Sequence, residues 1–117
     1  MSTTFLKHPI LSQFAAKMET LYQDKLERIL LFGSQARGDA AEDSDIDLLL
    51  LLNQEEVNPY REVPKITDVV FEINIKYNQL LFYLPMSLKR WENEQSFFID
   101  NVKREGITIW TKEWKKC

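Results

Sequence analysis

Two aspartates at the start of an apolar run are the residues of this chain best suited to chemistry. Asp45 and Asp47 are separated by one residue, and Asp47 leads directly into a run of five leucines. Alternate residues of a strand face the same way, so their Cα atoms would lie roughly 6.5–7 Å apart on one side of a strand. Carboxylates placed in this way repel each other unless a cation lies between them, and a hard divalent cation such as Mg²⁺ prefers oxygen ligands. The pattern therefore predicts a divalent metal site at the beginning of this strand.

A glycine–serine pair upstream of the aspartates supplies a second feature. Gly33 and Ser34 follow one apolar run and precede a short expected helix. Backbone N–H groups at such a turn, together with the Ser34 hydroxyl, form a natural cradle for phosphate, and Mg²⁺ is commonly bound by one or two carboxylates plus substrate phosphates. Taken alone, the glycine–serine pair is commonly a turn with a helix cap, and the aspartate pair is commonly a solvated pair of acids. An EF-hand interpretation of residues 43–54 fails, because Leu48 and Gln54 stand where glycine and glutamate are required.

The elements that must position these residues follow from the apolar pattern. Helical spacing indicates helices, short apolar runs indicate strands, and Ser34 and Gly38 suit the two ends of a short helix. The expected elements are a helix over 9–23, a strand over 28–32, a short helix over 35–37, a buried central strand over 46–52, a helix over 60–77, a strand over 80–84 stopped by Pro85, a helix from Leu88 that Ser87 caps and Gly106 ends, and a strand over 107–110.

The segment over 60–77 allows two interpretations. Apolar residues recur at helical steps of three and four, whereas those over 69–75 also alternate as in a strand. The helical stripe is longer, and Pro64 is tolerated only near a helix start, so a helix is predicted. The order of helices and strands then predicts an α/β (α+β) fold in which a small mixed β-sheet carries flanking helices.

Composition indicates a single small globular domain over 1–117. The chain has 117 residues, of which 44% are hydrophobic and 28% charged, enough for a core of its own. A net charge of −3 gives no bulk attraction to nucleic acid or to an anionic membrane, so neither is an expected partner. The single cysteine excludes a disulfide within the chain, and no apolar run is long enough to span a bilayer. These features predict a cytoplasmic protein.

The spacing of the glycine–serine pair and the aspartates resembles a known signature. Gly33-Ser34, ten residues, then Asp45-x-Asp47 matches the G-S-x(10)-D-x-D pattern of the polymerase-β-like nucleotidyltransferase superfamily, and LFGSQARGDAAEDSDIDLLL resembles its minimal nucleotidyltransferase branch. The resemblance implies the nucleotidyltransferase fold and Mg²⁺-dependent transfer of a nucleoside monophosphate from an NTP, with ATP as the expected donor. It also implies that Asp45 and Asp47 are catalytic and hold Mg²⁺, that Gly33 and Ser34 bind the triphosphate, and that Arg37 neutralises phosphate charge.

One acid of the superfamily pattern is missing. The superfamily normally has a third carboxylate on a later strand beside the Asp-x-Asp pair, whereas the expected strand over 80–84 carries none. Glu72 is the nearest candidate, and it qualifies only if its segment is a strand rather than a helix. A site with two carboxylates would leave the activity weak, dependent on a residue from a partner, or lost.

The acceptor of the transferred group is expected to be a separate molecule. The chain has little room for an acceptor-binding domain, so the acceptor is a second protein or is bound across a homo-oligomer. The minimal branch is often paired, as antitoxin, with a small helical HEPN-type toxin that some of these transferases adenylylate, and the resemblance implies such a partner here. Two other classes stay open: a binding module without catalysis that neutralises a partner by contact, and a transferase acting on a small hydroxylated molecule. The sequence leaves open the nucleotide, the acceptor, the oligomeric state and the source of any third metal ligand.

Overall fold

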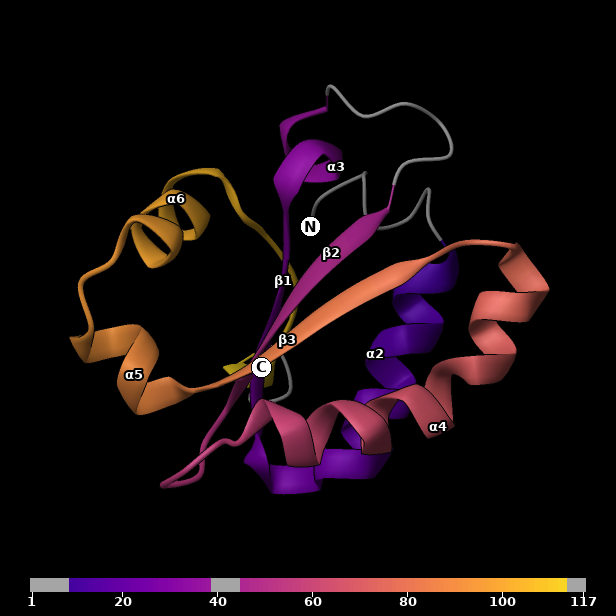
Figure 1. Ribbon diagram of the computed structural model, residues 1–117, viewed down its shortest axis with the longest axis horizontal. Coiled ribbons are helices and arrows are strands. Elements are labelled where there is room, and N and C mark those ends of the chain that lie inside the picture. Colours follow the sequence, from indigo (N-terminus) through magenta and orange to yellow (C-terminus); the bar gives the residue numbers. More distant parts are fainter. Residues whose placement is uncertain (1–8, 39–44, 114–117) are drawn as a thin grey trace.

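A mixed sheet with helices on both faces forms the centre of the computed structural model, which describes residues 9–38 and 45–113 (Figure 1). The described elements are α2 (Pro9–Tyr22), the 3-10 helix η1 (Gln23–Lys25), β1 (Leu26–Phe32), α3 (Gly33–Arg37), β2 (Ile46–Leu52), α4 (Pro59–Tyr77), β3 (Leu81–Ser87), α5 (Leu88–Asn93), α6 (Phe97–Glu105) and β4 (Ile107–Thr111). Figure 1 shows α2 and α4 on one side of the sheet, α5 and α6 on the other, and α3 at one end. None of the helices in these ranges is long and apolar enough to cross a membrane.

The strand order β3-β2-β1-β4 places β1 and β2 in the middle of the sheet. β1 pairs antiparallel with β2 and β4, whereas β2 and β3 are parallel and are joined by the crossover helix α4. In this register Asp47 lies opposite Phe32 on β1 and opposite Phe82 on β3. Side chains that are paired across neighbouring strands share a face of the sheet, so these three residues lie on the same face.

The leucine run of β2 is buried on both faces, as the sequence predicts for a central strand. Residues 48–52 are each 0% exposed. Leu48 and Leu50 belong to the core cluster under α2 and α4, and Leu49 and Leu51 to the cluster under α5 and α6. Because successive side chains of a strand point to opposite faces, β2 contributes to both core clusters. The same alternation puts Asp47 on the face that α5 and α6 cover, together with Leu49.

The helical interpretation of the segment before β3 is confirmed. α4 buries Ile66, Val70 and Ile73 against the first core cluster, and the side chain of Asn58 caps the helix by accepting the Tyr60 N–H at 3.0 Å. Glu72 is therefore an exposed helical residue, and α4 covers the face of the sheet opposite to the one that carries Asp47. Glu72 does not supply the third carboxylate.

The prediction that Pro85 stops the third strand is wrong. β3 extends through Pro85 to Ser87, and Pro85 pairs with Leu50. Proline lacks the N–H that a strand with two neighbours would need, but β3 lies at the edge of the sheet and has only β2 beside it.

The predicted helix from Leu88 to Gly106 is two helices. Ser87 caps α5 as predicted by accepting the Arg90 N–H at 3.1 Å, but α5 ends at Asn93, and Ser96 caps a new helix, α6. The Ser96 hydroxyl accepts the Ile99 N–H at 3.1 Å, and this second cap starts α6 as a helix of its own. Gly106 ends α6 as predicted, with a φ of −69°.

Candidate active site

The turn from β1 into α3 forms one half of the candidate site. Gly33 has a φ of +73°, a left-handed conformation that glycine adopts at low cost. Ser34 does not cap the helix as predicted: α3 begins one residue earlier, at Gly33, and Phe32 takes the N-cap position without a side-chain hydrogen bond. Gly38 closes α3 as predicted, with a φ of +81° and its N–H donated to the Ser34 carbonyl at 3.0 Å.

The carboxylate of Asp47 lies directly against Gly33. A Cβ atom built on Gly33 would lie 2.3 Å from Oδ2 of Asp47 and 3.3 Å from its Cγ. The pairing of Phe32 with Asp47 produces this approach, because it sets the start of β2 beside the end of β1. Glycine is therefore the residue that leaves room for the carboxylate, and the turn and the aspartate form one continuous surface.

The negative charges of the two aspartates repel each other. Asp45 is exposed and immediately precedes β2, whereas Asp47 is partly buried on it. Burial first, and the charge of Asp45 second, raise the pKa of the Asp47 carboxyl above its ordinary value. Among the described residues, neither carboxylate accepts a hydrogen bond or forms an ion pair. Such a pair fits a divalent cation, since a cation would remove both the repulsion and the cost of desolvation.

The raised pKa of Asp47 predicts how stability depends on pH in the absence of metal. The folded state holds this proton more tightly than the unfolded state, where the pKa of aspartic acid is about 3.9. The contribution of Asp47 to stability is therefore greatest below that pH, is lost as pH rises through the raised pKa, and stays lost above it. Denaturant unfolding in EDTA across this window should show the loss in the wild type and not in Asp47→Asn. Parallel profiles for the two proteins would contradict it.

A phenylalanine occupies the strand position beside Asp47. Phe82 pairs with Asp47 across the parallel strands, shares its face of the sheet and is 54% exposed. Residue 82 is the position on β3 from which an acidic side chain would lie beside the Asp47 carboxylate. No group of three or more metal-ligating acids, histidines or cysteines occurs within residues 9–38 and 45–113. The described site therefore has two carboxylates.

Arg37, the last residue of α3, lies against α6. Its guanidinium is 3.7 Å from Oε2 of Glu105 on α6, and it lines a cavity of about 190 Å³ together with Gly33 and Phe98. Phe98 meets Phe32 edge to face, with ring centroids 5.3 Å apart. The sequence did not predict that α6 contributes to this wall. Helical spacing does place residues 98, 102 and 105 on one face, but it does not show what that face contacts.

The fold and this site define a nucleotidyltransferase class of domain: a mixed sheet in which a glycine–serine turn meets a carboxylate pair on the adjacent strand. Residues 17–115 match the family described as Polymerase beta, Nucleotidyltransferase, and the chain belongs to that family. The predicted family, its fold and its enzyme class are thereby confirmed.

Two curated relatives come from Methanocaldococcus jannaschii. The one named "Putative protein adenylyltransferase MJ0141" is 35% identical over 100 residues, which covers 86% of this chain and 95% of the relative. The one named "Putative protein adenylyltransferase MJ0604" is 42% identical over 101 residues, which covers 86% and 94%. Both alignments span nearly the whole of each relative.

Solved structures share the fold at low sequence identity. A nucleotidyltransferase from Sulfolobus solfataricus aligns with a TM-score of 0.63 at 18% identity, covering 95% of this chain and 86% of that one. A toxin–antitoxin structure with AMP-PNP aligns with a TM-score of 0.57 at 18% identity, covering 88% and 75%. The toxin–antitoxin pair MntA-HepT aligns with a TM-score of 0.53 at 16% identity, covering 92% and 76%. At these identities the likeness concerns the fold alone.

Proposed function

We propose that this protein transfers AMP from ATP to a hydroxyl group of a protein acceptor in a Mg²⁺-dependent reaction. The observation that carries the proposal is the contact of the Asp47 carboxylate with Gly33, together with the repulsion between this carboxylate and that of Asp45. A phosphate group at the turn and a metal ion at the carboxylates would then be neighbours. Both relatives carry the name "Putative protein adenylyltransferase", and this name supports a protein as acceptor.

The residues of the site have distinct roles in this proposal. Asp45 and Asp47 would hold Mg²⁺, and the backbone at Gly33 together with Ser34 would bind the triphosphate. When bound, the metal ion stabilises negative charge on the attacking and leaving oxygens. The acceptor oxygen bonds to the α-phosphorus, the bond from that phosphorus to the bridging oxygen breaks, pyrophosphate leaves, and the hydroxyl proton passes to solvent.

Arg37 has a secondary role in the proposal. Its ion pair with Glu105 holds the guanidinium at the cavity that begins at Gly33, within the region where phosphate charge would gather. An arginine there stabilises negative charge through planar, charge-assisted hydrogen bonds.

The acceptor that we propose is a small HEPN-type toxin, for which this chain is the cytoplasmic antitoxin. Two of the fold relatives are structures of toxin–antitoxin pairs, and the cavity that the described residues form beside Gly33 has a volume of about 190 Å³. Small-molecule sites usually occupy about 300–1,000 Å³, so this cavity is too small to enclose an acceptor as well as a nucleotide. A separate protein that brings its own hydroxyl to the exposed Asp45 end of the site fits this geometry.

The test is transfer of label from ATP to the protein encoded beside this one. Purified chain, ATP labelled on the α-phosphate, Mg²⁺ and the neighbouring protein should give a labelled neighbour, and EDTA should prevent the labelling. Label on the γ-phosphate should not transfer, which distinguishes nucleotidyl transfer from phosphorylation. An unlabelled neighbour, in a mixture where the two proteins form a complex, would remove the acceptor assignment.

A second candidate is a binding module that neutralises a partner without catalysis. The position of Phe82 beside Asp47 favours it, because a third acid is absent from the described site. This function is supported if a chain with both aspartates replaced still binds the neighbouring protein and still suppresses its toxicity. It is excluded if suppression disappears while the complex still forms.

The variant Phe82→Asp tests the two-carboxylate site directly. A third carboxylate on this face should destabilise the metal-free protein through repulsion and tighten Mg²⁺ binding by about 30-fold, since even in water a charge at about 4 Å contributes roughly 1 kcal/mol per unit of ion charge, or roughly 2 kcal/mol for a divalent ion. Thermal unfolding with and without Mg²⁺ measures both effects, and Phe82→Asn is the matched control that lacks the charge. An equal response of the two variants to Mg²⁺ would show that Phe82 does not adjoin a metal site.

A further inference from the structure

A polar cavity of about 470 Å³ lies at the end of the sheet opposite to the candidate active site. It opens where β1 begins, at Leu26, and β2 ends, at Leu52, whereas Gly33 and Asp47 lie at the other end of these seven-residue strands. At about 3.3 Å per residue the two sites are roughly 20 Å apart. The volume lies within the range of small-molecule sites, about 300–1,000 Å³. This cavity is therefore separate from the site described above.

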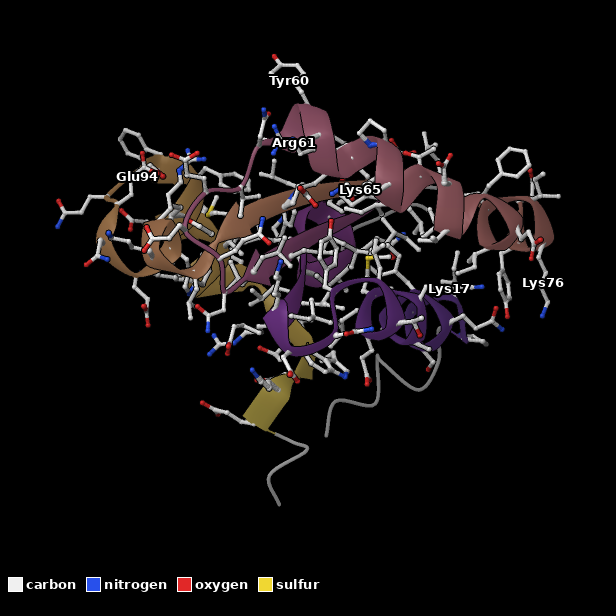
Figure 2. All side chains as sticks on the ribbon, turned by 90° about the horizontal axis from the view of Figure 1, so that it is seen from below. Lys17, Tyr60, Arg61, Lys65, Lys76 and Glu94 are labelled. Atoms are coloured by element: carbon white, nitrogen blue, oxygen red, sulfur yellow. The ribbon has the colours of Figure 1, made fainter. Side chains whose placement is uncertain are left out.

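Positive charge predominates in the wall of the cavity. Its charged lining residues are Lys25 of η1 and Arg61, Glu62 and Lys65 of α4, which gives three cations and one acid. Figure 2 shows Arg61 beside the first turn of α4 and Lys65 on the side of α4 toward α2, whereas Tyr60 points away from the body of the protein. In a chain whose net charge is −3, a concave surface with this excess of cations attracts anions.

The one acid of the cavity is already satisfied. Glu62 is 4% exposed, accepts a hydrogen bond from the Tyr22 hydroxyl at 2.9 Å, and lies 3.5 Å from the ammonium group of Lys65. Burial and this carboxylate raise the pKa of Tyr22, so its hydroxyl remains a donor at neutral pH. By contrast, Lys25 and Arg61 have no ion pair or side-chain hydrogen bond in the part of the chain that the structure describes. Two cations of the cavity are therefore available to a ligand.

Neutral donors and a strained backbone complete the wall. The amide side chains of Gln23 and Gln54 belong to the lining. Nε2 of Gln54 donates one of its two hydrogens to the Glu56 carbonyl at 3.0 Å, which leaves one for a ligand. Gln23 has a φ of +51°, a conformation that costs a residue other than glycine about 1–2 kcal/mol and that often occurs at functional sites. Amide N–H groups between cations are well suited to an anion that carries several oxygens.

We infer that this cavity is a binding site for a diphosphate group, held by Lys25 and Arg61 with Gln23 and Gln54 as neutral donors. The guanidinium of Arg61 can bind two phosphate oxygens at once, and Lys25 supplies a second positive charge from a different element. Inorganic pyrophosphate and the phosphate tail of a nucleotide share this chemistry. The inference does not depend on the proposed transferase activity, since it concerns the other end of the sheet.

Calorimetric titration with inorganic pyrophosphate in EDTA tests the inference without engaging a metal-dependent site. The wild type should bind one equivalent, and Arg61→Gln and Lys25→Gln should each weaken binding by about 10- to 100-fold, the range expected for a lost charge-assisted hydrogen bond. Glu62→Gln should act in the opposite direction and tighten binding. It removes the negative charge and releases Lys65, while the new amide oxygen can still accept the Tyr22 hydrogen bond.

Two controls separate a site from general charge effects. Lys76→Gln removes one positive charge at the far end of α4, outside the cavity, and should leave pyrophosphate binding within about twofold of the wild type. Asp45→Asn/Asp47→Asn should also bind normally, which keeps this result independent of the proposed function. No heat with the wild type, or an equal loss for Lys76→Gln and Arg61→Gln, overturns the inference.

The same titration identifies the source of the diphosphate. Tighter binding of ADP than of pyrophosphate, still without metal and still lost in Arg61→Gln, assigns the site to a nucleotide. Equal or weaker binding of ADP assigns it to the free anion. Binding of an RNA oligonucleotide without any binding of pyrophosphate contradicts a small-anion site.

Discussion

Replacing both aspartates, in Asp45→Asn/Asp47→Asn, should reduce nucleotidyl transfer by roughly 10³-fold or more while the protein remains folded. Asparagine keeps the size of each side chain but removes the two charges that would bind Mg²⁺. The loss of even one preorganised electrostatic group commonly costs 10²–10³-fold. The measurement is the initial rate of label transfer from ATP at saturating Mg²⁺, beside a thermal unfolding curve of each protein.

The stability of this double variant gives the prediction a second readout. Burial and the charge of Asp45 both disfavour the ionised form of Asp47, so at neutral pH without metal the variant should be at least as stable as the wild type. Adding Mg²⁺ should stabilise the wild type and leave the variant unchanged. Undiminished transfer by a well-folded double variant would show that these carboxylates are not the metal ligands of the reaction.

Gly33→Ala should also reduce nucleotidyl transfer, because it changes the turn that the Asp47 carboxylate contacts. An alanine Cβ would lie 2.3 Å from Oδ2 of Asp47, so the carboxylate would have to move. A misplacement of about 1 Å in a catalytic group can cost about 10²-fold in rate, and we expect a loss of transfer of that order. The left-handed backbone, with its φ of +73°, adds a conformational cost, so the total loss of stability should be about 2–4 kcal/mol.

Gly38→Ala is the matched control for this experiment. Gly38 also has a left-handed backbone, with a φ of +81°, but a Cβ there would meet no atom within 4 Å. It should lose only about 1–2 kcal/mol of stability and retain its transfer rate. Equal rates for the two variants, each measured well below its unfolding temperature, would show that the contact of Gly33 with Asp47 has no part in catalysis.

The sequence predicted the features that depend on residues close together along the chain. The apolar run of β2 indicated a strand buried on both faces, and the helical stripe through Ile66, Val70 and Ile73 indicated α4. These patterns are informative because burial of a strand or helix face acts on neighbouring residues with a period of 2 or 3.6. The signature from Gly33 to Asp47 is also local, and the family that it indicated is the family to which the chain belongs.

Element ends were predicted less well, because neighbouring elements decide them. Pro85 lies within β3 rather than after it, and this is possible only because β3 is an edge strand. Likewise, α5 and α6 are separate helices, each with its own serine cap, although the apolar spacing across them suggested one.

Only the tertiary structure decided which residues face one another across the sheet. The register that pairs Asp47 with Phe32 brings the carboxylate onto Gly33, and the pairing with Phe82 leaves the neighbouring strand without an acid. α4 packs on the face of the sheet opposite to the one that carries Asp47, so Glu72 does not supply a third carboxylate. The cavity around Arg61 likewise joins residues from three separate segments of the chain. Periodicity along a chain shows which face of an element is buried, whereas contacts between elements depend on strand register and helix packing, which are set by the whole fold.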